Sequence, residues 1–174
     1  MSSISIRYGL ISGFISVAFI LIFYVLNPAN IVSNWFSMIS FVIPIIFLIY
    51  TAKDTRKELD GFMTLNEGFK ATFFCAIIVV FISVIFNYIL YNVIDDGTLS
   101  MLMKEKAIES TQKISNMLGG NSELNDKINA ELEKQTFGFG IKELCIAIFF
   151  GLIVNAILCL FISLIFKKNP PLEV

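Results

Sequence analysis

The residues of this sequence that could do chemistry are polar but uncharged, and they lie inside long apolar stretches. Ser83 and Asn155 each fall near the middle of such a stretch, and Asn87 follows Ser83 by about one helical turn. Small and polar side chains in membrane helices commonly let the helices approach and hydrogen-bond to each other. Lining a path for a polar ligand or for water is the alternative role. Their similar depth favours a hydrogen bond between Ser83 and Asn155 across two helices.

The residue types on which most catalytic and metal sites depend are scarce. Histidine, the commonest metal ligand and neutral-pH proton carrier, does not occur in the chain. Cys75, Cys145 and Cys159 lie in apolar stretches and form no CxxC pair, so neither a metal site nor a disulfide framework is expected. No nucleophile–base pair, phosphate-binding loop or dinucleotide fingerprint is present. The sequence therefore predicts no catalytic residue, no metal, no cofactor and no enzymatic activity.

Four apolar stretches position the polar residues, and each is long enough to cross a bilayer. Of the 174 residues, 56% are hydrophobic and 16% are charged, and the mean hydropathy is +0.79. A soluble domain has about 25% charged residues, and a crossing needs about 20 apolar ones. The predicted crossings are 8–26, 34–52, 71–94 and 144–166. These features predict an all-α integral membrane protein, in which residues 1–174 form one antiparallel bundle of four transmembrane helices.

Local signals refine the second and third helices. Thr64 and Glu67 have the spacing of a capping box, so the third helix should begin in water, before its apolar part. Pro44 lies in the middle of the second crossing and cannot donate a hydrogen bond to Ser40, which predicts a kink there.

Glycines at helical spacing are the candidate packing residues. Gly9 and Gly13 are four residues apart and offer a flat face for close helix contact. Gly151 belongs to a similar row of small and polar residues in the fourth crossing. We expect neighbouring helices to approach at these three positions.

Residues 95–143 predict a helical hairpin between the third and fourth crossings. Apolar residues recur at helical spacing from 99 to 118, and a second stripe contains Ile128 and Leu132. Glu109 and Lys113 are spaced for an ion pair on the wet face of the first helix. The apolar stripes must meet each other, the bilayer surface or a partner, which makes Leu102, Ile128 and Leu132 a candidate partner face.

Charge decides the predicted orientation. With four crossings both termini share one side, together with loop 53–70 and the basic residues near the helix ends: Arg7, Lys53, Arg56, Lys57, Lys70, Lys167 and Lys168. The positive-inside rule places this side in the cytoplasm and residues 95–143 outside it. A net charge of −1 gives no reason to expect a nucleic-acid partner.

Three motifs resemble a known family. They are Arg7-Tyr8-Gly9-Leu10-Ile11-Ser12-Gly13 at the start of the first helix, the segment from Gly61 to Lys70 that enters the third, and Tyr91-Asn92-Val93-Ile94-Asp95 at its end. In these the chain resembles the small four-helix bacterial membrane proteins grouped as domain of unknown function 4199. The resemblance implies a bundle in the bacterial cytoplasmic (inner) membrane and carries no catalytic or binding residues. Members are encoded near lipid-directed glycosyltransferases, so it also implies such an enzyme as a partner.

The leading hypothesis from the sequence is a non-enzymatic accessory or scaffold subunit of a membrane complex. Its partners would be the lipid bilayer and either another membrane protein or further copies of this chain. The alternative is a small channel or transporter for a neutral or lipid-like solute, lined by Ser83, Asn87 and Asn155. A lipid-modifying enzyme is the third hypothesis, and the missing reactive cluster argues against it.

Overall fold

Helices account for nearly all of the described chain. The computed structural model describes residues 3–117, 130 and 138–168. Four long helices form the bundle: α1 (Ser3–Leu26), α2 (Asn34–Glu58), α3 (Leu65–Ile89) and α6 (Ile141–Phe166). Shorter elements are the 3₁₀ turn η1 (Pro28–Asn30) and the π-helical turn η2 (Leu90–Ile94), and α4 (Thr98–Met117) lies outside the bundle.

The four bundle helices are long and apolar enough to cross a membrane, as the sequence predicts. The shortest, α1, has 24 residues, which at 1.5 Å per residue gives about 36 Å. This length exceeds a hydrocarbon core of about 30 Å. The chain is therefore a multi-pass membrane protein with an all-α fold.

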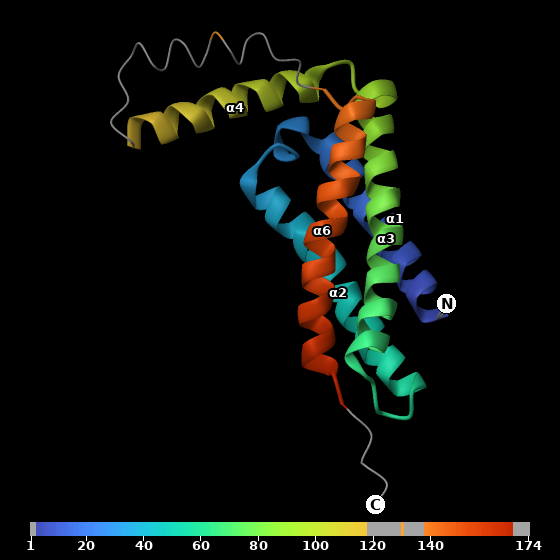
Figure 1. Ribbon diagram of the computed structural model, residues 1–174. Coiled ribbons are helices and arrows are strands. Elements are labelled where there is room, and N and C mark those ends of the chain that lie inside the picture. Colours follow the sequence, from blue (N-terminus) through green and yellow to red (C-terminus); the bar gives the residue numbers. More distant parts are fainter. Residues whose placement is uncertain (1–2, 118–129, 131–137, 169–174) are drawn as a thin grey trace, which may run out of the picture.

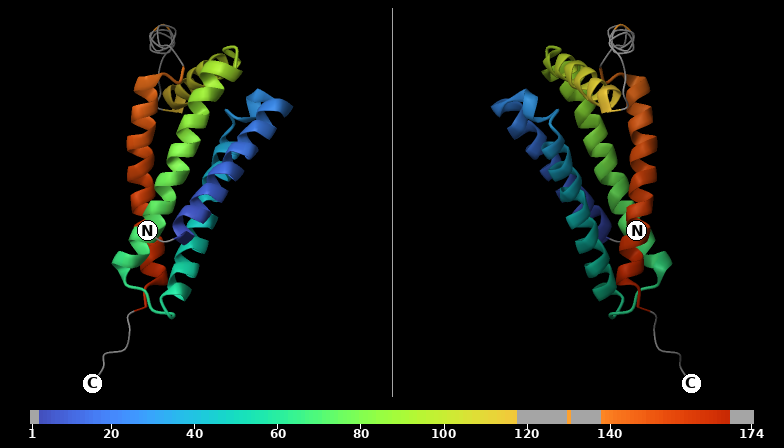
Figure 2. Two further views of the ribbon diagram at one scale, coloured as in Figure 1. Left: turned by 90° about the vertical axis from the view of Figure 1, so that its right-hand side faces the viewer. Right: turned by 90° about the vertical axis from the view of Figure 1, so that its left-hand side faces the viewer.

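Helix α3 is the centre of the bundle, because it contacts α1, α2 and α6 and its contacts with α1 and α6 are the most extensive between any two helices. Figure 1 shows α4 running across one end of this bundle, and Figure 2 shows α1 and α2 side by side and inclined to α6. We call the end with η1, η2, α4 and residues 138–140 the α4 end. The opposite end holds the start of α1, residues 59–64 and the end of α6. Of the predicted hairpin, α4 is the first helix, and the second lies outside the described residues.

The capping box predicted for the third helix is confirmed. Thr64 is the N-cap of α3, its backbone amide donates to Glu67 Oε2 at 2.8 Å, and its hydroxyl accepts from the Glu67 amide at 3.4 Å. Two amides that the first helical turn leaves unpaired are thereby satisfied. The box fixes where α3 begins relative to the loop before it.

The loop before α3 is tied to the end of α6. Met63 and Lys168 exchange two backbone hydrogen bonds of 2.8 and 2.9 Å, and Met63 is fully buried. The Lys168 ammonium lies 5.3 Å from the centre of the Phe62 ring, within the range of a cation–π contact. Gly61 has φ +84°, a conformation that glycine adopts without strain. The segment from Gly61 to Lys70 thus serves the packing of its own chain at the opposite end.

Candidate functional site

The α4 end is organised around Asp95, which is 8% exposed. One carboxylate oxygen accepts from the Tyr24 hydroxyl of α1 at 3.1 Å. The other accepts from the backbone amides of Gly97 and Leu99, both at 3.0 Å, and so caps the start of α4. A single side chain therefore joins α1, the end of α3 and the start of α4.

The π-helical turn η2 brings further groups to this junction. The backbone amide of Asp95 donates to the Leu90 carbonyl five residues earlier, at 2.8 Å. Tyr91 stacks on Phe139 with ring centres 5.8 Å apart, and the Asn92 amide donates to the Phe139 carbonyl at 2.8 Å. Turns of this type often occur at functional sites. Here the turn connects the C-terminal end of α3 with the residues just before α6 and just before α4.

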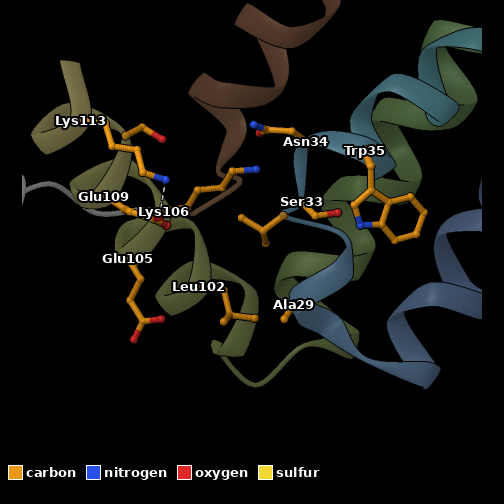
Figure 3. Close-up of a pocket in the computed structure, with 11 residues that line it drawn as sticks. Ala29, Ser33, Asn34, Trp35, Leu102, Glu105, Lys106, Glu109 and Lys113 are labelled. Atoms are coloured by element: carbon orange, nitrogen blue, oxygen red, sulfur yellow. Dashed lines mark hydrogen bonds and ion pairs between the residues drawn. The ribbon is translucent and has the colours of Figure 1, made fainter. Parts of the chain in front are cut away.

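A cleft of about 580 Å³ opens between α4 and the turn that joins α1 to α2. Figure 3 shows Leu102, Lys106, Glu109 and Lys113 on the α4 wall, and Ser33, Asn34 and Trp35 on the other wall. The α4 residues on this wall are three to four positions apart, so they share the face of the helix that is directed toward the start of α2. The cleft is therefore mostly polar, with both signs of charge on one wall.

Two polar side chains in this cleft, those of Lys106 and Asn34, have no hydrogen-bond partner among the described residues. Figure 3 shows the side chains of Lys106 and Asn34 pointing toward one another from opposite walls. Neither makes a side-chain hydrogen bond or ion pair within the part of the chain that the structure describes, whereas Lys113 pairs with Glu109 at 2.5 Å. The predicted Glu109–Lys113 ion pair is thus confirmed. The cleft can accept a group that carries hydrogen-bond acceptors between its two walls.

Glu109 stays ionised in this setting. Its hydrogen bond from the Lys113 ammonium, with further attraction to Lys113 and Lys106, holds the pKa of the Glu109 carboxyl below its ordinary value. The Glu109 carboxylate therefore pairs with Lys113, and Glu105, the other carboxylate that lines the cleft, points away from Lys106 and Asn34 in Figure 3. Lys106 is thus the charged side chain that faces Asn34.

A second, smaller cleft of about 360 Å³ adjoins the first. The two share Val32, Lys106 and Ser110, and the second adds Ile31, Ser37, Met103 and Ala107. Its walls are consequently more apolar than those of the polar cleft. Lys106 lies at the boundary between a polar and an apolar space.

Two of the three polar residues predicted within the membrane line a third cavity, of about 190 Å³, between α2, α3 and α6. Ser83 and Asn155 both contribute to it, as do Ser40 and Pro44 of α2. No hydrogen bond between Ser83 and Asn155 occurs among the described residues. The Asn155 amide donates instead to the Gly151 carbonyl at 2.8 Å.

Two further contacts involve polar side chains inside the bundle. Asn87 likewise donates within its own helix, to the Ser83 carbonyl at 2.8 Å. The polar side chains that do meet across α3 and α6 are Thr72 and Ser163, with hydroxyl oxygens 3.4 Å apart. They lie nearer the opposite end than the predicted pair.

The predicted packing glycines differ in how closely they are approached. A Cβ at Gly9 would lie 2.9 Å from Ile78 Cβ, and one at Gly13 would lie 2.7 Å from Ile82 Cδ1. Both positions therefore bring α1 into close contact with α3. A Cβ at Gly151 would meet Val80 at 3.4 Å, an ordinary contact distance.

The predicted partner face is only partly described. Leu102 is half-buried and lies on the wall of the polar cleft, so it faces its own chain. Ile128 and Leu132 lie outside the described residues. Within the described part of the chain, no group of three or more His, Cys, Asp or Glu side chains could hold a metal ion.

Sequence reasoning missed two tyrosine–aspartate contacts that hold α1 at both ends. The Tyr8 hydroxyl donates to Asp54 Oδ2 at 2.5 Å, and Tyr24 donates to Asp95. Tyr8 and Asp95 both belong to motifs that carried the family resemblance, and this was the available signal. Asn34 and Lys106 gave no comparable signal, because their facing arrangement depends on the direction of α4.

Comparison with known proteins gives a family but no characterised relative. The family model described as protein of unknown function (DUF4199) matches residues 7–168, so the chain belongs to this family. No curated protein and no solved structure matches the chain.

Proposed function

We propose that this member of the DUF4199 family is a non-enzymatic accessory or scaffold subunit of a complex in the bacterial cytoplasmic membrane. The observation that carries the proposal is that three carboxylates make hydrogen bonds or ion pairs that hold helices together or cap them. Asp54 holds Tyr8 and Lys57, Glu67 caps α3, and Asp95 holds Tyr24 and caps α4. Carboxylates committed to such contacts position helices and are poorly placed for acid–base chemistry.

The proposed orientation follows from charge. The basic residues near the helix ends gather at the opposite end, which the positive-inside rule places in the cytoplasm together with both termini. The α4 end then faces outward, and α4 extends across it.

Met101 and Met103 are two residues apart and so lie on opposite sides of α4. Met103 lines the smaller cleft with Ile31 and Val32, and its sulfur accepts from the Tyr91 hydroxyl at 3.1 Å. Met101, which is 65% exposed, faces away from the bundle and is our proposed point of contact with a partner protein.

Photo-crosslinking from native membranes tests this proposal. A photoreactive residue at Met101 should crosslink to one membrane protein, and mild purification should return that protein at a fixed ratio to this chain. The matched control is the same probe at Ile153, which lies on α6 and is 42% exposed at membrane depth. Crosslinks from Met101 to lipid alone, with no protein at a fixed ratio, would overturn the accessory role.

A second candidate function rests on the cavity inside the bundle. It is lined by Ser83 and Asn155, and the Ser40 hydroxyl beside it is buried without a partner among the described residues. We propose as the alternative a channel or transporter for a neutral or lipid-like solute. Flux into liposomes should then be lost in Asn155→Leu and kept in Asn87→Leu, since Asn87 is not among the cavity-lining residues. Equal flux in both variants would exclude this path.

A further inference from the structure

We propose that the cleft between α4 and the α1–α2 turn binds the phosphate-bearing head group of a membrane lipid. This inference goes beyond the accessory role and does not require it. It starts from Lys106 and Asn34, which point toward one another across the cleft and have no acceptor among the described residues. The Lys106 ammonium can only donate, and the exposed Asn34 amide can donate as well as accept, so a group with several acceptor oxygens can bond to both side chains at once.

The charge of the cleft selects the kind of acceptor. Four charged side chains line the cleft, and Glu109 is paired with Lys113. Figure 3 shows the Glu105 carboxylate pointing away from Asn34, so Lys106 is the charged group that faces Asn34. The start of α2 lies on the same wall as Asn34, so the positive end of its dipole adds to the attraction for an anion. A phosphate group offers several oxygens to an ammonium and an amide at once, and hydrogen bonds between charged partners are the stronger ones.

The place of the cleft indicates a lipid as the source of that phosphate. Trp35 lines the cleft in the first turn of α2, and tryptophan in membrane proteins is enriched at the head-group level. The adjoining apolar cleft, with Ile31, Met103 and Ala107, begins at Lys106. An amphiphile could place its phosphate beside Lys106 and its glycerol and first methylenes in the apolar space. Free phosphate would leave that second space unused.

Native mass spectrometry of the delipidated, full-length protein in detergent tests the proposal. The probes are dimyristoyl phosphatidylglycerol, dimyristoylglycerol, which has the same chains without phosphate, and inorganic phosphate. We expect one tight phosphatidylglycerol adduct and no comparable diacylglycerol adduct. Inorganic phosphate that displaces the lipid at equal concentration would overturn the lipid assignment in favour of a free-phosphate site.

Variants identify the site. Loss of a charged hydrogen bond in Lys106→Gln should weaken phosphatidylglycerol binding about tenfold, and Lys106→Arg should restore most of it. Asn34→Ala, which leaves the charge unchanged, should weaken binding by about threefold. The control is Lys142→Gln, which removes the same charge from an exposed position in the first turn of α6, outside both clefts. Equal affinities for Lys106→Gln and Lys142→Gln would overturn the proposal.

Discussion

Gly9 and Gly13 place the backbone of α1 directly against side chains of α3. A Cβ at Gly9 would meet the Ile78 Cβ at 2.9 Å and the Cys75 carbonyl oxygen at 3.1 Å. Neither neighbour is the end of a flexible side chain, so the helices must separate to accommodate a methyl group. At Gly13 the nearest atom is the terminal Cδ1 of Ile82, which can rotate away, but the Ile82 Cβ follows at 3.1 Å. Both glycines therefore hold α1 close to α3, and the nearest fixed atom is closer at Gly9.

We predict that Gly9→Ala destabilises the bundle by about 1–3 kcal/mol, the usual cost of overpacking a tight contact. The matched control is Gly151→Ala, whose Cβ would meet Val80 at an ordinary 3.4 Å. Both substitutions gain the same intrinsic helix propensity, so their difference isolates the contact. Unfolding midpoints in a detergent titration measure this difference. Equal midpoints for the two variants would show that α1 is free to move off α3.

Replacing Tyr24 tests how much its hydrogen bond to Asp95 stabilises the junction of α1, α3 and α4. Tyr24→Phe removes one donor from a largely buried carboxylate and should cost about 1 kcal/mol of stability. Tyr88→Phe is the control, because the Tyr88 hydroxyl has no side-chain hydrogen bond among the described residues. Thermal unfolding in mild detergent compares the two, and a loss as large in Tyr88→Phe would contradict the role given to Asp95.

At the scale of helices, the start of α3 is fixed by its capping box. Thr64→Ala should cost about 1 kcal/mol, because it leaves the Glu67 amide without its acceptor. The change should also speed hydrogen exchange at the first amides of α3. Asn66→Ala, an exposed position in the same turn, should leave both unchanged. If exchange in the first turn is as slow in Thr64→Ala as in the wild type, the cap is not what holds this end.

The features that the sequence predicts well are local or depend on length. The four spanning helices follow from apolar length, and the Thr64–Glu67 box follows from a spacing of three residues. Contacts such as Tyr24–Asp95 join residues 71 positions apart. They depend on how each helix is rotated, and a helix that is apolar on all sides does not reveal which face it buries.

The predicted hydrogen bond between Ser83 and Asn155 shows a related difficulty. The periodicity correctly indicates that these residues approach the same space, since both line one cavity. It does not indicate the acceptor, because the carbonyl four residues earlier is within reach of any such side chain. Asn155 uses that of Gly151, and Asn87 uses that of Ser83.

At the scale of the whole molecule, the two ends of the bundle differ in construction. At the opposite end, a short loop pairs with the end of α6 through Met63 and Lys168. At the α4 end, a 20-residue helix crosses the bundle and forms a polar cleft with the α1–α2 turn. This asymmetry suits a protein whose contacts outside the bilayer are made mainly on one side, and the orientation decides which side that is.

Cysteine accessibility measures the orientation directly. In a Cys145→Ser background, only the fully buried Cys75 and Cys159 remain. A membrane-impermeant maleimide should then label Met101→Cys, at the α4 end, in intact spheroplasts. Asn66→Cys, at the opposite end, should be labelled only after permeabilisation, because the basic helix ends retain that side in the cytoplasm. Labelling of Asn66→Cys in intact spheroplasts would reverse the orientation and place the lipid-binding cleft on the cytoplasmic leaflet.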